Sequence, residues 1–222
     1  MHFLKPEDLR VGALVRRYPV TVAVTAIVTT VGLSTQDNSR AQMDRLMARY
    51  GMTWPGVVHL RFWTMPVSTV LQSDPGFPWI ILFFVLTSLF ALETLGGSLA
   101  AAATFLLADW ISAPLTEVVL RMLALLGNHE ARDLLTTGAT GSSAAFHGAF
   151  AAAAMLLSRR WAGRMISLMV VVVIFQFVFE RLDDAIAHAI ATLVGVILAH
   201  FVWHPWLERS ARPAGHPRQA VS

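Results

Sequence analysis

Apolar residues gather in six long runs along the chain, and each run ends at charged residues, proline or glycine. A helix rises about 1.5 Å per residue, so runs of this length approach the ~30 Å thickness of the hydrocarbon core of a membrane. The pattern therefore predicts an all-α membrane protein with a bundle of six transmembrane helices. The six runs are residues 18–35, 77–95, 98–113, 139–158, 164–180 and 186–206.

Two connections between the runs are long, and both have an amphipathic pattern. Residues 36–76 carry a polar helical stretch and then several aromatic residues, which suit a segment that lies in the headgroup layer. Residues 114–137 form the second connection of this kind. The predicted organisation is a cytoplasmic N-terminus (1–17), a six-span domain (18–206) with the long outer loop 36–76, and a cytoplasmic tail (207–222).

Composition supports the membrane class. Of 222 residues, 55% are hydrophobic and only 14% are charged, too few to solvate the surface of a soluble domain of this length. The chain contains no cysteine, which excludes disulfides and thiolate chemistry. Its net charge of +3 comes from basic residues that stand singly or in pairs at the ends of apolar runs. This placement indicates a lipid bilayer rather than nucleic acid as the partner.

The basic residues also predict an orientation. In the predicted six-span topology, ten of the 17 Lys and Arg residues lie on the same side of the membrane as the N-terminus. The other seven are spread over the long segments on the opposite side. This density favours a multi-pass protein of the plasma (inner) membrane with both termini in the cytoplasm. Arg outnumbers Lys 16 to 1 in a chain rich in Ala, Gly and Val, which hints at a bacterial, GC-rich genome. The ten are Lys5, Arg10, Arg16, Arg17, Arg159, Arg160, Arg164, Arg209, Arg212 and Arg218.

The fourth run begins with hydroxyl groups among small residues, and the sixth run contains a histidine. Ser143 and its neighbours are, taken alone, typical packing residues of membrane helices. His188 is different, because an ionisable group within an apolar run is costly and is a candidate for function. Ser143 precedes Arg159 by 16 residues, and His188 precedes His204 by 16 residues. Both side chains are therefore expected ~24 Å above the cytoplasmic face, at one depth.

A serine and a histidine at one depth indicate nucleophilic chemistry, since an imidazole has the basicity to take the proton of the hydroxyl. Around these residues the sequence resembles the rhomboid family of intramembrane serine proteases. The serine motif G-x-S-G matches Gly141 to Ala144, with Ala for the last Gly, and Gly148 follows five residues after Ser143. The histidine motif A-H-x-x-G-x-x-x-G matches 187–195, with Ala at its first Gly position and Gly195 at its last.

Further landmarks of this resemblance lie earlier in the chain. Glu93, Gly97 and Ser98 match an E-x-x-x-G-S element after the second span, and Arg61 with Thr64 is similar to a W-R-x-x-T element that lacks its Trp. The resemblance implies a six-span rhomboid-like bundle, with Ser143 as nucleophile and His188 as general base. It also implies a transmembrane protein as substrate, arriving laterally between helices. Structural roles are expected for Arg61, Glu93, Gly97, Gly148 and Gly195.

The chain departs from the family pattern at the oxyanion site. Phe77 and Ile81 occupy the positions of a usual H-x-x-x-N pair, and neither side chain can donate a hydrogen bond. Substitute donors would be backbone N–H groups, such as those of Ser143 and Gly141, a group from the outer loop, or His147, which is one helical turn after Ser143.

Three roles are open for His147, which stands where members of the family often carry an aromatic residue: it donates to the oxyanion, acts as an alternative base, or simply packs. Thr140 is the alternative position for the nucleophile, because Gly138 to Gly141 also fits the motif. Ser143 is preferred, since only that register places a Gly five residues later and since the methyl group of a threonine hinders attack.

Other polar residues in the runs carry weaker predictions. Asp184, one turn before His188, could orient the imidazole, although pairing with Arg181 or solvation is the favoured interpretation. Asp109 has no partner evident in the sequence. His200 and His204 have the spacing of a metal pair but lack a third ligand, so an interfacial anchor is preferred.

No cofactor or metal is expected, since the sequence has no zinc-protease motif, phosphate loop or dinucleotide fingerprint. The alternative to an intramembrane protease is a catalytically inactive protein of the same fold. Such a protein would bind membrane-protein clients or serve as a subunit of a membrane complex, and the missing donors at Phe77 and Ile81 favour it.

Overall fold

The computed structural model describes residues 11–71, 78–136 and 141–210. Within these ranges the regular elements are all helices, which confirms the all-α prediction. They are α1 (Val11–Arg17), α2 (Pro19–Thr35), α3 (Arg40–Tyr50), α4 (Trp54–Val58), the 3-10 turn η2 (Phe62–Thr64), α5 (Met65–Val70), α6 (Pro78–Leu125), α7 (His129–Leu134), α8 (Ser143–Leu156), α9 (Arg159–Phe179), α10 (Leu182–Leu198), the π-helical turn η3 (Ala199–Trp203) and α11 (His204–Ser210).

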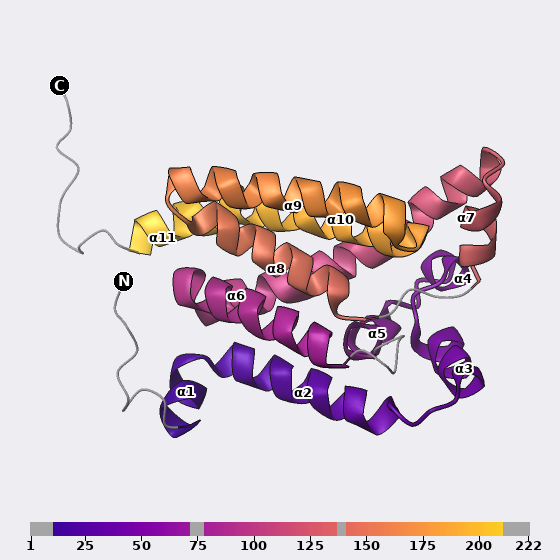
Figure 1. Ribbon diagram of the computed structural model, residues 1–222, viewed down its shortest axis with the longest axis horizontal. Coiled ribbons are helices and arrows are strands. Elements are labelled where there is room, and N and C mark those ends of the chain that lie inside the picture. The colour runs from indigo at the N-terminus through magenta and orange to yellow at the C-terminus, as the bar shows by residue number, and fades with distance from the viewer. Residues whose placement is uncertain (1–10, 72–77, 137–140, 211–222) are drawn as a thin grey trace.

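The long helix α6 reverses direction at Gly97. This glycine has φ 81° and ψ 171°, a conformation that disfavours any residue with a Cβ atom. Val85 and Phe105 belong to one buried cluster, whereas a straight helix would hold them ~30 Å apart. The helix therefore consists of two antiparallel limbs, 78–96 and 98–125. The first runs toward the Gly97 turn, and the second runs back alongside it (Figure 1).

The second limb of α6 is longer than the sequence pattern predicts. The third apolar run was expected to end at residue 113, before Pro114, but the helix continues to Leu125. It continues because Leu120 and Ala124 are buried against α7 and the start of α10, and this burial offsets the hydrogen bond that proline cannot make. The prediction of a separate amphipathic connection over 114–137 is therefore wrong in its first half.

The predicted outer loop 36–76 contains several short helices that pack against α6. Met52 and Met65 form a buried cluster with Ala113 of α6. Thr69 of α5 donates a hydrogen bond of 2.5 Å to the Asp109 carboxylate, which gives Asp109 the partner that the sequence did not reveal. The loop is thus held on the second limb, near α7 (Figure 1).

Glu93 joins α2 to the turn between the limbs of α6. Its buried carboxylate accepts hydrogen bonds from the N–H of Val20 at 3.1 Å, from the N–H and hydroxyl of Thr21 at 2.8 and 2.7 Å, and from the Ser98 hydroxyl at 2.6 Å. The first N–H groups of a helix have no acceptor within the helix, so Glu93 satisfies the start of α2. These contacts are those of a structural residue.

Helix α8 lies between α6 and the pair α9 and α10 (Figure 1). It can approach its neighbours closely because a glycine faces a glycine where α8 crosses α10. A Cβ atom added to Gly195 would overlap the backbone carbonyl of Gly148, and one added to Gly148 would overlap Ala108 and come within 3.0 Å of the Ala191 oxygen. Only glycine fits at either position without moving a helix.

Among the described residues, three helical segments are long and apolar enough to cross a membrane: Phe83–Leu125, which includes the reversal, Arg159–Phe179 and Leu182–Ser210. Two shorter apolar helices are Pro19–Thr35 and Ser143–Leu156. Helix α9 buries only Met169 and Gln176, and its exposed residues from Leu168 to Phe179 are all apolar. Such a surface is compatible with location in a membrane, where lipid would cover it.

Candidate functional site

Ser143 is the first residue of α8. Gly141, two residues earlier, has φ 113° and donates its N–H to the Ser68 carbonyl of α5 at 2.8 Å. This bond anchors the start of α8 against the outer loop, and it leaves the Gly141 N–H unavailable to an oxyanion. The Ser143 N–H lies in the first turn of the helix, where no acceptor exists within the helix.

His188 lies on α10 with only 5% of its surface exposed, and its ring stacks on that of His147. The ring centroids are 4.0 Å apart and the planes differ by 14°. Since His147 is one turn after Ser143 on α8, this contact brings the serine's end of α8 beside the imidazole of α10. The stack continues through Phe146 to Phe84 of α6, with centroid separations of 4.6 and 5.1 Å.

Both nitrogens of His147 are engaged. Nδ1 lies 2.8 Å from the Ser143 carbonyl oxygen, which can only accept, so Nδ1 carries the proton. Nε2 is then an acceptor, and it receives a hydrogen bond of 3.1 Å from the Gln176 amide of α9. Of the three roles open to His147, this geometry matches packing against His188; neither nitrogen is free to act as a base or to donate to an oxyanion.

Two residues at the end of α9 complete the surroundings of His188, and the sequence analysis missed them. Gln176 donates to Glu180 Oε1 at 3.3 Å, and Glu180 Oε2 lies 3.2 Å from His188 Nδ1. This last contact is an ion pair only when His188 is protonated, and neither ring nitrogen of His188 hydrogen-bonds to a described residue.

A signal for these residues was present in the sequence. Gln176 is a polar side chain in the apolar stretch FQF, and Glu180 follows it by four residues, on the same face of a helix. The sequence analysis weighed Asp184 as the residue that orients His188 but favoured its solvation or its pairing with Arg181. Asp184 lines a nearby cavity, and Arg181 forms an ion pair with Asp183 at 2.8 Å.

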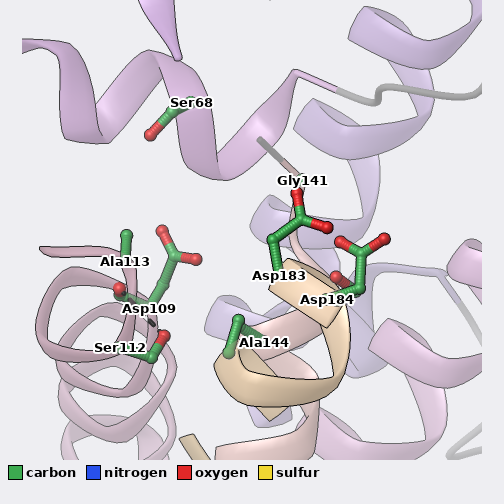
Figure 2. A pocket seen from close by; sticks show the side chains of 10 residues that line it. Ser68, Asp109, Ser112, Ala113, Gly141, Ala144, Asp183 and Asp184 are labelled. Carbon is green, nitrogen blue, oxygen red and sulfur yellow. Dashed lines mark hydrogen bonds between the residues drawn. The ribbon is translucent and has the colours of Figure 1, made fainter. Parts of the chain in front are cut away.

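A small polar cavity of about 20 Å³ adjoins Ser143. Asp109 of α6 faces it from one side, and Asp183 and Asp184 face it from the first turn of α10 (Figure 2). Its volume suits roughly one water molecule. Ser143 and Ala187, the residue before His188, both line the cavity, so the hydroxyl-bearing residue and the turn that carries the imidazole share one space.

Several other predicted residues can also be placed. The Arg61 carbonyl accepts from the Thr64 hydroxyl at 2.9 Å, which closes the turn before α5. His204 Nε2 lies 3.4 Å from the Met155 carbonyl, and no group of three or more metal-ligating side chains occurs among the described residues. Thr140 and Phe77 lie outside the described residues, as does the side chain of Ile81.

Comparison of the chain with protein-family models, with curated proteins and with solved structures found no match. The chemistry of this site is therefore argued from its own geometry. That geometry is a serine at a helix start, a buried imidazole beside it, and a carboxylate against the imidazole.

Proposed function

We propose that the chain is a rhomboid-like intramembrane serine protease with six spans, which cleaves other membrane proteins in or beside their transmembrane segments. The observation that carries the proposal is the contact between α8 and α10, where His147, one turn after Ser143, stacks on His188 at 4.0 Å. This contact supports a shared depth for the serine and the imidazole. Both termini would lie in the cytoplasm, and the site would open toward the outer face of a bacterial inner membrane.

In the proposed reaction the Ser143 hydroxyl attacks the carbonyl carbon of the scissile peptide while His188 takes its proton. The Ser143 N–H would stabilise the oxyanion that forms. The tetrahedral intermediate then collapses, the C–N bond breaks, and His188 returns the proton to the leaving amine. Water hydrolyses the acyl-enzyme by the same steps, again with His188 as base and then acid.

The hydrogen bond between Ser143 and His188 would form during this reaction. His188 Nε2 has no hydrogen-bond partner among the described residues, so it is free to accept from the Ser143 hydroxyl. Catalytic hydrogen bonds are often long before substrate binds and tighten only in the complex.

Lateral access of the substrate is supported by an apolar cavity of about 180 Å³ between the first limb of α6, α8 and α9. His147 lines it together with Phe84, Phe146 and Leu168, so the cavity reaches the ring that stacks on His188. A transmembrane segment is the kind of partner that suits apolar walls in lipid.

Labelling with a fluorophosphonate probe tests the proposal on the purified chain in detergent or liposomes. The wild type is expected to react, Ser143→Ala to abolish labelling, and His188→Ala to reduce it at least ~100-fold, as expected for loss of the base. Ser142→Ala is the matched control, because it removes the adjacent hydroxyl and should leave labelling intact. Equal labelling of wild type and Ser143→Ala would contradict the proposal.

A second candidate is an inactive protein of the same fold that binds transmembrane clients or belongs to a membrane complex. The lack of any hydrogen bond to either His188 nitrogen among the described residues favours it, since a working base usually contacts its nucleophile. A folded wild type that never reacts with the probe but co-purifies with a membrane protein would support this candidate.

A further inference from the structure

We infer that Glu180 is a positioning residue for His188, holding the Nδ1 side of the imidazole so that Nε2 faces the start of α8. The inference rests on the proposed function and adds a third member to its serine and histidine. The carboxylate oxygen Oε2 and His188 Nδ1 are 3.2 Å apart, although the residues lie on different helices. A carboxylate on one nitrogen fixes the ring orientation and stabilises the imidazolium that forms when the other nitrogen takes a proton.

The other charged or titratable groups near His188 do not take this position. His147 of α8 lies flat against the ring and uses both of its nitrogens elsewhere. Asp184, on α10 itself, and Asp109, on α6, line the polar cavity, and neither is paired with a His188 nitrogen. Glu180 is thus the carboxylate in contact with the imidazole within the described part of the chain.

Gln176 fixes the position of Glu180. Its amide nitrogen lies 3.3 Å from Glu180 Oε1 and 3.1 Å from His147 Nε2, so one side chain of α9 contacts both the carboxylate and the stacked ring beside His188. Helix α9 buries little else, since Met169 is its other buried residue. A displacement of α9 would therefore withdraw Glu180 from His188. Because α9 also lines the apolar cavity, a movement of this helix would change the orientation of the His188 ring.

Kinetic comparison of Glu180 variants tests the inference. Probe labelling separates the affinity for the probe (KI) from the maximal labelling rate (kinact). We expect Glu180→Ala to lower kinact about 10-fold or more while KI and the thermal midpoint stay unchanged; the loss should be smaller than for a fully buried acid because the Glu180 side chain is 39% exposed. Glu180→Asp should restore part of kinact. Glu208→Ala is the matched control and should label within about threefold of the wild type, because Glu208 is an exposed carboxylate of α11, outside the site.

Nitrogen NMR of the histidine-labelled chain gives a readout that does not need activity. The His188 signals are identified by their loss in His188→Gln. A proton on Nδ1 in the wild type that moves toward Nε2 in Glu180→Ala supports the contact, and an unchanged tautomer overturns it.

The outcomes separate the two proposals. If Ser143 reacts with the probe and Glu180→Ala reacts equally fast, the positioning role is overturned and the protease proposal stands. If wild type and Ser143→Ala label alike, the protease proposal is overturned, and the histidine spectrum alone decides whether Glu180 holds His188.

Discussion

Two buried ionisable residues, Glu93 and His188, are accommodated in opposite ways. The Glu93 carboxylate accepts four hydrogen bonds from two separate parts of the chain. His188 has a stacked ring and one carboxylate contact, and its nitrogens make no hydrogen bond to a described residue. A saturated group stabilises the fold, whereas an unsaturated one keeps a nitrogen available for chemistry.

Removal of the Glu93 carboxylate should destabilise the protein. Glu93→Ala leaves the N–H groups of Val20 and Thr21 without their acceptor, and we expect a loss of about 3 kcal/mol in the free energy of unfolding. Denaturation in mixed detergent micelles measures this, with the exposed Glu208→Ala as control. A change equal to that of the control would contradict the structural role of Glu93.

At this scale the sequence identified the candidate serine and histidine but not their surroundings. Ser143 and His188 could be identified because a hydroxyl cluster and an imidazole are conspicuous in apolar runs. Glu180 lies at the end of a run, where charged residues are ordinary, and its role depends on a contact across two helices. Sequence spacing does not encode such a contact.

The crossing of α8 and α10 is the packing feature on which the site depends. Gly148 and Gly195 meet backbone to backbone at this crossing; Gly148 directly follows His147 on α8, and Gly195 lies about two turns after His188 on α10. The sequence predicted that these small residues allow helices to approach closely. It did not predict which residue each of them faces. The length of α6 was underestimated for a related reason: Pro114 suggested a stop, and only tertiary burial of Leu120 keeps the helix going.

A methyl group at this crossing should separate the helices. Gly195→Ala places a Cβ atom against the Gly148 carbonyl, and we expect a loss of stability of about 2 kcal/mol or more, together with loss of probe labelling. Gly163→Ala on α9 is the matched control, because nothing lies within 4 Å of its added Cβ and alanine favours a helix by about 0.5–1 kcal/mol. Equal thermal midpoints for the two variants would contradict this account of the crossing.

At the scale of the whole molecule, the order of the apolar helices could be predicted from the sequence. Their arrangement in space could not, because it depends on the reversal at Gly97 and on the crossing at Gly195. The proposed six-span topology makes α6 a hairpin through the membrane, with the Gly97 turn and the turn at Ser158 on the cytoplasmic side. The site then lies near the outer end of the bundle. The distribution of basic residues predicts this orientation. The packing of the helices does not distinguish it from the opposite orientation.

Because the chain has no cysteine, single substitutions can report its orientation cleanly. Asp37→Cys and His129→Cys lie at exposed positions of the outer segments and should react with an impermeant maleimide on intact cells. Ser158→Cys and Ser210→Cys, also exposed, should react only after permeabilisation. Labelling of Ser158→Cys from outside would reverse the proposed topology.

The central claim is that Ser143 is a nucleophile activated by His188, and the position of the probe on the chain tests it most directly. Tryptic cleavage at Arg132 and Arg159 releases one peptide that carries Thr140, Ser142 and Ser143. Fragmentation of this peptide in the mass spectrometer is expected to locate the phosphonyl group on Ser143, and the adduct should form at least ~100-fold more slowly in His188→Ala. A phosphonyl group on Thr140, or on Ser143 at the same rate without the imidazole, would contradict the claim.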